Sequence, residues 1–353
     1  MRQTVAMQSW AVRLERGALQ RGAIMKVFIA DKFEQNGIHR LEQLGCEVTY
    51  QPGTAGEALT DALRKGGYGI LIVRSTRVPR ETLEAAPDLH MVIRAGAGTD
   101  TIDVEAASEN DIRVCNCPGM NSVAVAELTI GLMIALDRQI VDETDDLRHR
   151  VWNKKKYSRA RGLKGRTLGI WGLGRIGAEV ARRAKAFEMR LLYSDVIERA
   201  DLERELGIRR VSTEQLLSES DFLTLHVPGG IQTKHLLGEE ELAIMKPTAY
   251  VINCSRGGVV DEQALARAIA NGTLAGAALD VYEIEPGADE REFRDPILSV
   301  PGIYGTHHVG ASTEQAQAAV AEETVRIVEA FMDRREFLHC VNPPKHASST
   351  LRA

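Results

Sequence analysis

Short apolar runs alternate with amphipathic stretches along most of the chain, beginning at Met25. Buried parallel strands have continuous apolar runs rather than alternating ones, and Ile-Leu-Ile-Val at 70–73 has this form. The pattern predicts strands, with helices such as 37–44 between them, at 26–30, 47–50, 70–73 and 91–94. Strands separated by helices are typical of a parallel α/β fold.

A second, stronger series of apolar runs begins near Thr167. It predicts further strands, again separated by helices, at 167–171, 190–194, 222–226, 250–253, 276–278 and 303–305. Between the two series, the amphipathic segment 123–150 is predicted to be one helix that crosses from one domain to the other. A last helix at 313–334 is predicted to return to the first domain.

These elements predict two Rossmann-like domains, each a doubly wound parallel sheet, with the second inserted into a discontinuous, flavodoxin-like first domain. We expect the first domain to comprise 25–122 and 306–342, and the second 123–305. Residues 1–24 and 343–353 are expected to be disordered extensions. The arginines in 1–24 also suit an organelle transit peptide, but its single serine argues against one, so we expect a cytoplasmic protein.

Composition narrows the classes of function. The net charge of -5 disfavours nucleic-acid binding across the whole surface, although a local basic patch could hold a small anionic substrate. No apolar run reaches the roughly 20 residues that a membrane span needs. Cys115 and Cys117 lie two residues apart, but no second pair completes a zinc site, so no metal is expected. The five cysteines are too few and scattered for a disulfide framework and are expected to be reduced thiols.

A glycine-rich motif follows the apolar run at 168–171 and opens a predicted helix. In it, Gly172 permits a tight turn, Gly174 lets the backbone approach a pyrophosphate, and Gly177 lets helix pack on strand. The next predicted strand ends in Asp195, 18 residues past Gly177, where a carboxylate can bind the ribose hydroxyls and repel a 2′-phosphate. The next basic residue is Arg199. The motif therefore predicts NAD rather than NADP.

Three other predicted strands are followed by residues suited to hydride transfer on a 2-hydroxy acid. Arg256 is followed by two glycines, and its guanidinium can bind a carboxylate with two hydrogen bonds. A histidine can accept the hydroxyl proton near neutral pH, and a neighbouring carboxylate raises its pKa and fixes its tautomer. Spacing alone does not choose between Glu283 and Glu285, or between His307 and His308.

From about Met25 to Asn342 these motifs resemble the D-isomer-specific 2-hydroxyacid dehydrogenases. The resemblance implies Arg256 as the substrate arginine, Glu285 (before a proline) and His308 (before a hydrophobic residue and glycine) as catalytic, and Asp280 on the nicotinamide side. It also implies that 123–305 binds NAD and that 25–122 with 306–342 binds substrate, with reaction in the cleft between the domains. One departure is His307, where the family commonly has proline.

Within the family, the chain is most similar to the phosphoglycerate dehydrogenases. The segment 94–103 resembles their substrate loop, 72–75 resembles a segment with a phosphate-binding arginine, and 152–157 resembles a basic loop that in some members reaches the partner subunit's site. The resemblance implies conversion of 3-phosphoglycerate to 3-phosphohydroxypyruvate, in serine biosynthesis, by a homodimer. Many relatives also carry a C-terminal serine-binding domain, and we expect no such feedback here.

The candidate site residues form three groups. The catalytic group is Arg256, Glu285 and His308. The expected cofactor contacts are Gly172, Gly174, Arg175, Ile176, Gly177, Asp195, His226, Pro228, Cys254, Ser255, Asp280 and Gly310. The expected substrate contacts are Arg74, Ser75, Arg94, Ala95, Gly96, Ala97, Gly98, Lys154 and Lys155.

Two other functions fit the same motifs. One is reduction of glyoxylate, hydroxypyruvate or another unphosphorylated 2-keto acid, against which the arginine and lysine candidates argue. The other, of a different class, is an NAD(H)-sensing binding protein similar to transcriptional corepressors on this scaffold. The complete set of Arg256, Glu285 and His308 favours catalysis.

Overall fold

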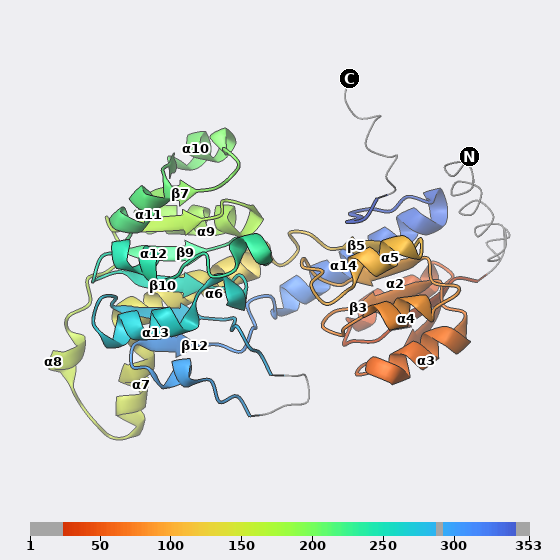
Figure 1. Ribbon diagram of the computed structural model, residues 1–353, viewed down its shortest axis with the longest axis horizontal. Coiled ribbons are helices and arrows are strands. Elements are labelled where there is room, and N and C mark those ends of the chain that lie inside the picture. Colours follow the sequence, from red (N-terminus) through yellow and green to blue (C-terminus); the bar gives the residue numbers. More distant parts are fainter. Residues whose placement is uncertain (1–23, 287–291, 344–353) are drawn as a thin grey trace. The chain divides into compact units, whose positions relative to one another are not determined.

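The computed structural model describes residues 24–286 and 292–343, so the predicted extensions lie almost entirely outside the described residues. The chain divides into two compact units, one of residues up to Asn121 and from Glu314 onward, the other Ser122–Thr313 (Figure 1). This division groups residues 306–313, which include His308, with the second unit.

The first unit is built on a five-stranded parallel sheet in the order β2-β1-β3-β4-β5, the flavodoxin order. Its strands are β1 (Lys26–Ile29), β2 (Glu47–Tyr50), β3 (Ile70–Val73), β4 (Met91–Arg94) and β5 (Arg113–Asn116). Alternate side chains of β1 face opposite cores, Val27 and Ile29 on one side and Phe28 on the other. Helices α2 (Gln35–Gln43) and α14 (Glu314–Arg334) pack on the first face, and α3 (Gly56–Gly66), α4 (Arg80–Glu84) and α5 (Val104–Glu109) on the second.

The second unit is built on a seven-stranded parallel sheet in the order β12-β11-β10-β9-β6-β7-β8. Its strands are β6 (Thr167–Trp171), β7 (Arg190–Ser194), β8 (Arg209–Arg210), β9 (Phe222–Leu225), β10 (Tyr250–Asn253), β11 (Gly276–Leu279) and β12 (Ile303–Gly305). Helices α6 (Ser122–Arg138), α9 (Arg175–Ala186) and α10 (Ala200–Leu206) contribute to one core. Helices α11 (Thr213–Glu219), α12 (Glu239–Ile244) and α13 (Glu262–Ala270) contribute to the other. The predicted fold of two doubly wound parallel sheets is confirmed.

The prediction of one helix over 123–150 is wrong. The segment forms α6 and a separate α7 (Ile140–Arg148), because Gln139 adopts a left-handed conformation (φ 52°) that interrupts the helix. Helix α6 buries ten of its 17 residues and exposes one side that includes Val123, Glu127 and Gly131, whereas α7 buries none. A left-handed non-glycine residue leaves no mark in the apolar pattern, so the break could not be predicted from that pattern.

Strand β5, the two-residue strand β8 and helix α8 were not predicted either. Strand β5 was missed because its apolar run is only Val-Cys between polar residues, although all of β5 except Asn116 is buried. The basic segment at 152–157, expected as a loop, contains the short helix α8 (Lys154–Tyr157), which Asn153 caps by accepting a hydrogen bond from the Lys156 N–H. Figure 1 shows α7 and α8 extending from the body of the second unit.

Candidate active site

The glycine-rich turn joins β6 to α9. Gly172 has φ 94°, and a Cβ there would lie 2.7 Å from the His226 carbonyl oxygen. A Cβ on Gly177 would lie 2.3 Å from the Gly172 carbonyl oxygen, so this glycine permits close helix packing. Around Gly174, which precedes the first residue of α9, a Cβ would meet nothing within 4 Å. The turn therefore leaves space at a helix N-terminus, where free N–H groups can bind phosphate, and the residues fit a dinucleotide.

Asp195 follows β7 and braces this turn. Its carboxylate accepts hydrogen bonds from the Leu173 N–H at 2.6 Å and from the Ile197 N–H at 2.9 Å. The same carboxylate is the group predicted to bind the ribose hydroxyls. Asp195 is therefore suited both to stabilise the phosphate-binding turn and to bind the ribose hydroxyls.

Two arginines lie at the same turn, and the sequence pointed to only the first of them. Arg199 donates to the Leu173 carbonyl at 2.9 Å and pairs with Asp201. Arg210, on β8, donates to the Asp195 carbonyl at 2.8 Å. No spacing rule signals Arg210, because the pairing of β7 with β8 brings it to the turn.

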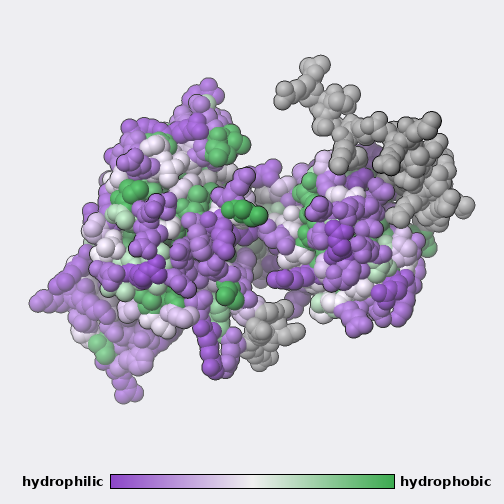
Figure 2. Space-filling view, in the orientation of Figure 1, coloured by the Kyte–Doolittle hydropathy of each residue, from purple (hydrophilic) through white to green (hydrophobic). Residues whose placement is uncertain are grey.

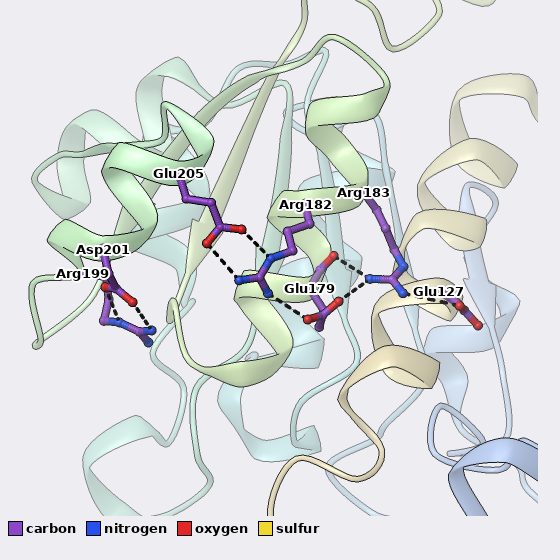
Figure 3. A network of polar contacts seen from close by, with 7 residues as sticks. All are labelled: Glu127, Glu179, Arg182, Arg183, Arg199, Asp201 and Glu205. Atoms are coloured by element: carbon purple, nitrogen blue, oxygen red, sulfur yellow. Dashed lines mark hydrogen bonds and ion pairs between the residues drawn. The ribbon is translucent and has the colours of Figure 1, made fainter.

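An ion-pair network fixes the helix that follows the turn (Figure 3). Arg182 on α9 binds Glu205 of α10 through two nitrogens, at 2.8 and 3.1 Å. Arg183 binds Glu179 within α9 at 2.7 Å and reaches Glu127 of α6 at 3.5 Å. Ion pairs near the surface contribute little stability each, and this network links α9 to α10 and to α6.

His226 follows β9 and faces the same end of the sheet as the turn, since its N–H donates to the Trp171 carbonyl. Burial lowers the pKa of His226 to about 3, so the ring is neutral. Its Nε2 lies 2.9 Å from the Thr224 hydroxyl, and its Nδ1 is buried without a hydrogen-bond partner among the described residues. An unsatisfied buried ring nitrogen is expected to bind a ligand atom, which fits the prediction of His226 as a cofactor contact.

The structure pairs each of the two candidate glutamates with a different histidine. His308 Nδ1 lies 2.8 Å from Glu285 Oε2, whereas Glu283 Oε1 lies 3.0 Å from Nε2 of His235. Burial opposes ionisation of Glu285, but the hydrogen bond and charge of His308 and weaker contributions from Tyr282 and Arg256 lower its pKa. An ionised Glu285 accepts a hydrogen bond from Nδ1–H of His308, which leaves Nε2 of His308 for a substrate. His307 is exposed.

Asp280 fixes the histidine-bearing turn. Its carboxylate, 2% exposed, accepts hydrogen bonds from the Thr306 hydroxyl at 2.7 Å and from the N–H groups of Val309 and Gly310 at 2.9 Å. His308 has φ 50°, a left-handed conformation that is uncommon for residues other than glycine. The buried carboxylate thus holds a strained backbone in place, a role that the sequence did not indicate.

Arg256 and Glu285 belong to adjoining turns. Asn253 at the end of β10 binds the Arg256 carbonyl at 2.9 Å and accepts from the Ser255 N–H and hydroxyl. A Cβ on Gly257 would lie 1.7 Å from the Tyr282 carbonyl oxygen, so the turn after β10 touches the turn after β11. Glycine at this position lets Arg256 and Glu285 share one site.

Glu262, the first residue of α13, is a buried carboxyl that sequence reasoning missed. It accepts a hydrogen bond from the Glu283 N–H at 2.6 Å. Burial, together with the charges of Asp295, Glu283 and Glu285, raises the pKa of Glu262 to about 7. Nothing in the sequence marks this glutamate, since the first turn of a helix is normally a solvent-exposed place for an acid.

The remaining candidates in this unit lie as follows. Burial raises the pKa of Cys254 to about 12, so its thiol stays protonated at neutral pH. Pro228 is exposed after β9, and Arg175 and Ile176 begin α9. Lys154 and Lys155 are exposed on α8.

The substrate-loop candidates lie in the first unit, at the ends of β3 and β4. The N–H groups of Arg74, Ser75 and Thr76 all donate to Asp31 Oδ2, at 2.6, 3.1 and 3.0 Å. The Arg74 guanidinium donates to Gln317 at 3.1 Å. A Cβ on Gly96 would lie 1.5 Å from Nη1 of Arg94, so this guanidinium lies against the loop of residues 95–98.

Comparison with known proteins identifies the family. Residues 130–310 match the model of the D-isomer specific 2-hydroxyacid dehydrogenase, NAD binding domain. The chain is 40% identical over 311 residues to D-3-phosphoglycerate dehydrogenase of Methanocaldococcus jannaschii, covering 86% of this chain and 58% of that one. It is 38% identical over 314 residues to glyoxylate reductase of Thermococcus litoralis, covering 87% and 93%. The chain belongs to the D-isomer-specific 2-hydroxyacid dehydrogenase family.

Solved structures of this family share the fold. D-lactate dehydrogenase from Aquifex aeolicus, complexed with NAD and lactic acid, superposes with a TM-score of 0.77 at 29% identity, covering 90% of this chain and 99% of that one. The predicted NAD-type cofactor is therefore confirmed. The chain spans 58%, 58% and 52% of the length of three relatives named D-3-phosphoglycerate dehydrogenase. Among the described residues, no helix has the length and apolar character needed to cross a membrane.

Proposed function

We propose that this dehydrogenase transfers hydride between NAD and C2 of a D-2-hydroxy acid. The observation that carries the proposal is the Glu285–His308 pair at 2.8 Å, with His308 held by Asp280 in a strained turn. A histidine that is oriented by a carboxylate and restrained by its backbone is suited to move a proton repeatedly between substrate and solvent.

Each residue has a definite task in this reaction. Arg256 binds the substrate carboxylate by its guanidinium. His308 Nε2 takes the C2 hydroxyl proton during oxidation, and Glu285 stabilises the resulting imidazolium. In the reverse direction, protonated His308 polarises the keto oxygen and then protonates it. A dinucleotide held by the turn at Gly172–Gly177 and by Asp195 would supply the acceptor and donor of the hydride.

We infer 3-phosphoglycerate as the substrate. A phosphate needs several cations, and Arg74, Arg94, Lys154 and Lys155 are the candidates. Relatives named D-3-phosphoglycerate dehydrogenase support this choice.

One observation favours an unphosphorylated 2-keto acid instead. The amide groups at 74–76 bind Asp31, and the Arg74 guanidinium binds Gln317, so this segment has a structural role of its own. Relatives at similar identity are named glyoxylate reductase and hydroxypyruvate reductase.

The test is NADH oxidation by the purified chain with 3-phosphohydroxypyruvate, hydroxypyruvate, glyoxylate, pyruvate and 2-oxoglutarate in parallel. The expected result is that kcat/KM is highest with 3-phosphohydroxypyruvate. The variants Arg74→Gln and Arg94→Gln are expected to lose this preference. A higher kcat/KM with an unphosphorylated acid would reject the phosphorylated substrate but keep the dehydrogenase. Binding of NADH without turnover of any acid would favour an NAD(H)-sensing protein.

A further inference from the structure

Cys115 and Cys340 face each other across an antiparallel pairing at the edge of the first unit's sheet. The Asn116 N–H donates to the His339 carbonyl at 3.4 Å, and the Val341 N–H to the Val114 carbonyl at 2.9 Å. These bonds flank the two cysteines, which makes them a non-hydrogen-bonded pair with Cα atoms about 4.5 Å apart. That separation lies within the range of about 4.4–6.8 Å that a disulfide spans.

The side chain of Asn342 fixes this register. Its Oδ1 accepts a hydrogen bond from the Val114 N–H at 2.7 Å, and its Nδ2 donates to the Ile112 carbonyl at 2.9 Å. The segment that carries Cys340 is therefore bound to β5 on both sides of the cysteine pair.

The two thiols are chemically unequal. Cys115 is fully buried and hydrogen-bonded to Cys340, which is partly exposed. That hydrogen bond lowers the pKa of Cys340 against the opposing effect of burial, and the N–H groups of Asn342 and Val114 and the Arg113 charge add to it. A thiolate is the reactive form of cysteine, so Cys340 is the nucleophile and Cys115 the buried second thiol.

We propose that Cys115 and Cys340 form a reversible disulfide when the chain meets a hydroperoxide. The Cys340 thiolate attacks the peroxide, the O–O bond breaks, and sulfur is oxidised to a sulfenic acid while water or an alcohol leaves. Cys115 sulfur then attacks the Cys340 sulfur. The S–O bond breaks, water leaves with the Cys115 proton, and the S–S bond forms. Two thiols are oxidised and one peroxide is reduced.

Cys117 is the competing partner. It lies two positions along the same chain from Cys115, which in an extended strand is about 7 Å, at the limit for a disulfide. Its thiol instead lies 3.4 Å from the Thr324 hydroxyl and 3.7 Å from the Val320 carbonyl. The cross-strand pair is therefore favoured.

The pair is adjacent to the predicted substrate loop. The Asn116 side chain donates to the Ala97 carbonyl at 2.5 Å, and the Cys117 N–H donates to the Gly96 carbonyl at 2.8 Å. The two residues that follow Cys115 thus hold the backbone of that loop.

The experiment treats the reduced full chain with hydrogen peroxide at neutral pH, alkylates the remaining thiols and maps peptides without reductant. We expect a linked pair of peptides containing Cys115 and Cys340 that dithiothreitol separates. Linkage of Cys115 to Cys117, or irreversible oxidation of Cys340 without linkage, would overturn the proposal. The proposal would also be overturned if peroxide had oxidised a buried thiol such as Cys46 while Cys115 and Cys340 were both still fully alkylated.

Matched variants separate the two roles. Cys117→Ser is expected to keep the linkage. In Cys115→Ser, Cys340 is expected to stop at a sulfenic acid that dimedone traps, and in Cys340→Ser, Cys115 is expected to stay reduced. If dimedone instead trapped a sulfenic acid at Cys115, Cys115 would be the nucleophile and the proposed role of Cys340 would be rejected. Because the linkage is measured on the wild-type chain, a variant that fails to fold does not remove the test.

Discussion

At the scale of single residues, the contact between His308 and Glu285 defines the proposed chemistry. His307 and His308 are both exposed, but of the two only His308 contacts Glu285 in the described structure. This difference gives a matched pair of variants, because the two histidines are adjacent in sequence and only one contacts the carboxylate.

His308→Gln removes the proton acceptor while keeping a polar side chain. We expect kcat to fall by about 10²–10⁴-fold, the usual contribution of general acid–base catalysis, with the Kd for NADH nearly unchanged. His307→Gln should keep most of the activity. Steady-state kinetics and fluorescence titration with NADH measure both quantities, and equal losses in the two variants would contradict the assignment.

Glu262 gives a prediction for stability against pH. Its folded pKa of about 7 exceeds the ordinary value of 4.5, so the native state binds this proton more tightly than the unfolded chain. The contribution of this group to the free energy of unfolding is therefore highest below pH 4.5 and falls as the pH rises toward 7.

Glu262→Gln keeps an acceptor for the Glu283 N–H but cannot ionise. We expect the variant to lose this part of the pH dependence, so that its stability relative to wild type increases from pH 5 to pH 8 (roughly the window of the shift). Urea unfolding at several pH values measures the difference. Parallel curves for the two proteins would show that the carboxyl is not perturbed.

At the scale of elements, the turn between β6 and α9 separates the roles of two glycines. A Cβ on Gly177 would meet backbone 2.3 Å away, whereas a Cβ on Gly174 would meet nothing within 4 Å. One glycine therefore serves packing within the protein, and the other is free to serve a ligand.

Gly177→Ala is expected to lower the free energy of unfolding by about 1–3 kcal/mol, because helix and strand must move apart. Gly174→Ala should unfold like wild type but bind NADH at least tenfold more weakly, because its methyl group occupies space for the pyrophosphate. Thermal unfolding and NADH titration of both variants separate the effects. Unchanged NADH affinity in Gly174→Ala would place the pyrophosphate elsewhere.

At the scale of the whole molecule, the described surface is mostly hydrophilic on the face in Figure 2, with apolar groups in small patches. Helix α7 and the segment after it differ, because they bury no side chain and expose several apolar ones. These are Ile140, Val141, Leu147, Val151 and Trp152, with Trp152 81% exposed. We propose that the chain forms a homodimer through this extension, since exposed apolar side chains concentrated on one segment favour association.

Trp152→Asp with Leu147→Asp is expected to convert the dimer to a monomer, because charges replace apolar contacts in the interface. Ile244→Asp, an exposed apolar position on α12, is the control and should leave the dimer intact. Sedimentation velocity measures the state. A wild-type monomer, or a double variant that remains dimeric, would reject this interface.

Prediction from the sequence succeeded where neighbouring residues alone determine the local structure. Continuous apolar runs predicted most strands of both sheets, because a strand buried on both faces must be apolar throughout. The glycine spacing predicted the turn at Gly172–Gly177, because Gly172 has a left-handed backbone and Gly177 leaves no room for a Cβ. Gln139, β5, β8 and α8 were missed, because each depends on a single backbone conformation, on burial by distant segments or on pairing with another strand.

The sequence by itself determined the α/β class, the glycine-rich turn and the residue types of the candidate site. Only the tertiary structure decided which partner each residue has: Glu285 for His308, Asp280 for the turn at Val309, Arg210 for Asp195, and Cys340 for Cys115. The physical reason is that parallel strands bring their carboxyl ends together whatever their distance along the chain. Hydrogen bonds across those ends depend on register and burial, which no local pattern encodes.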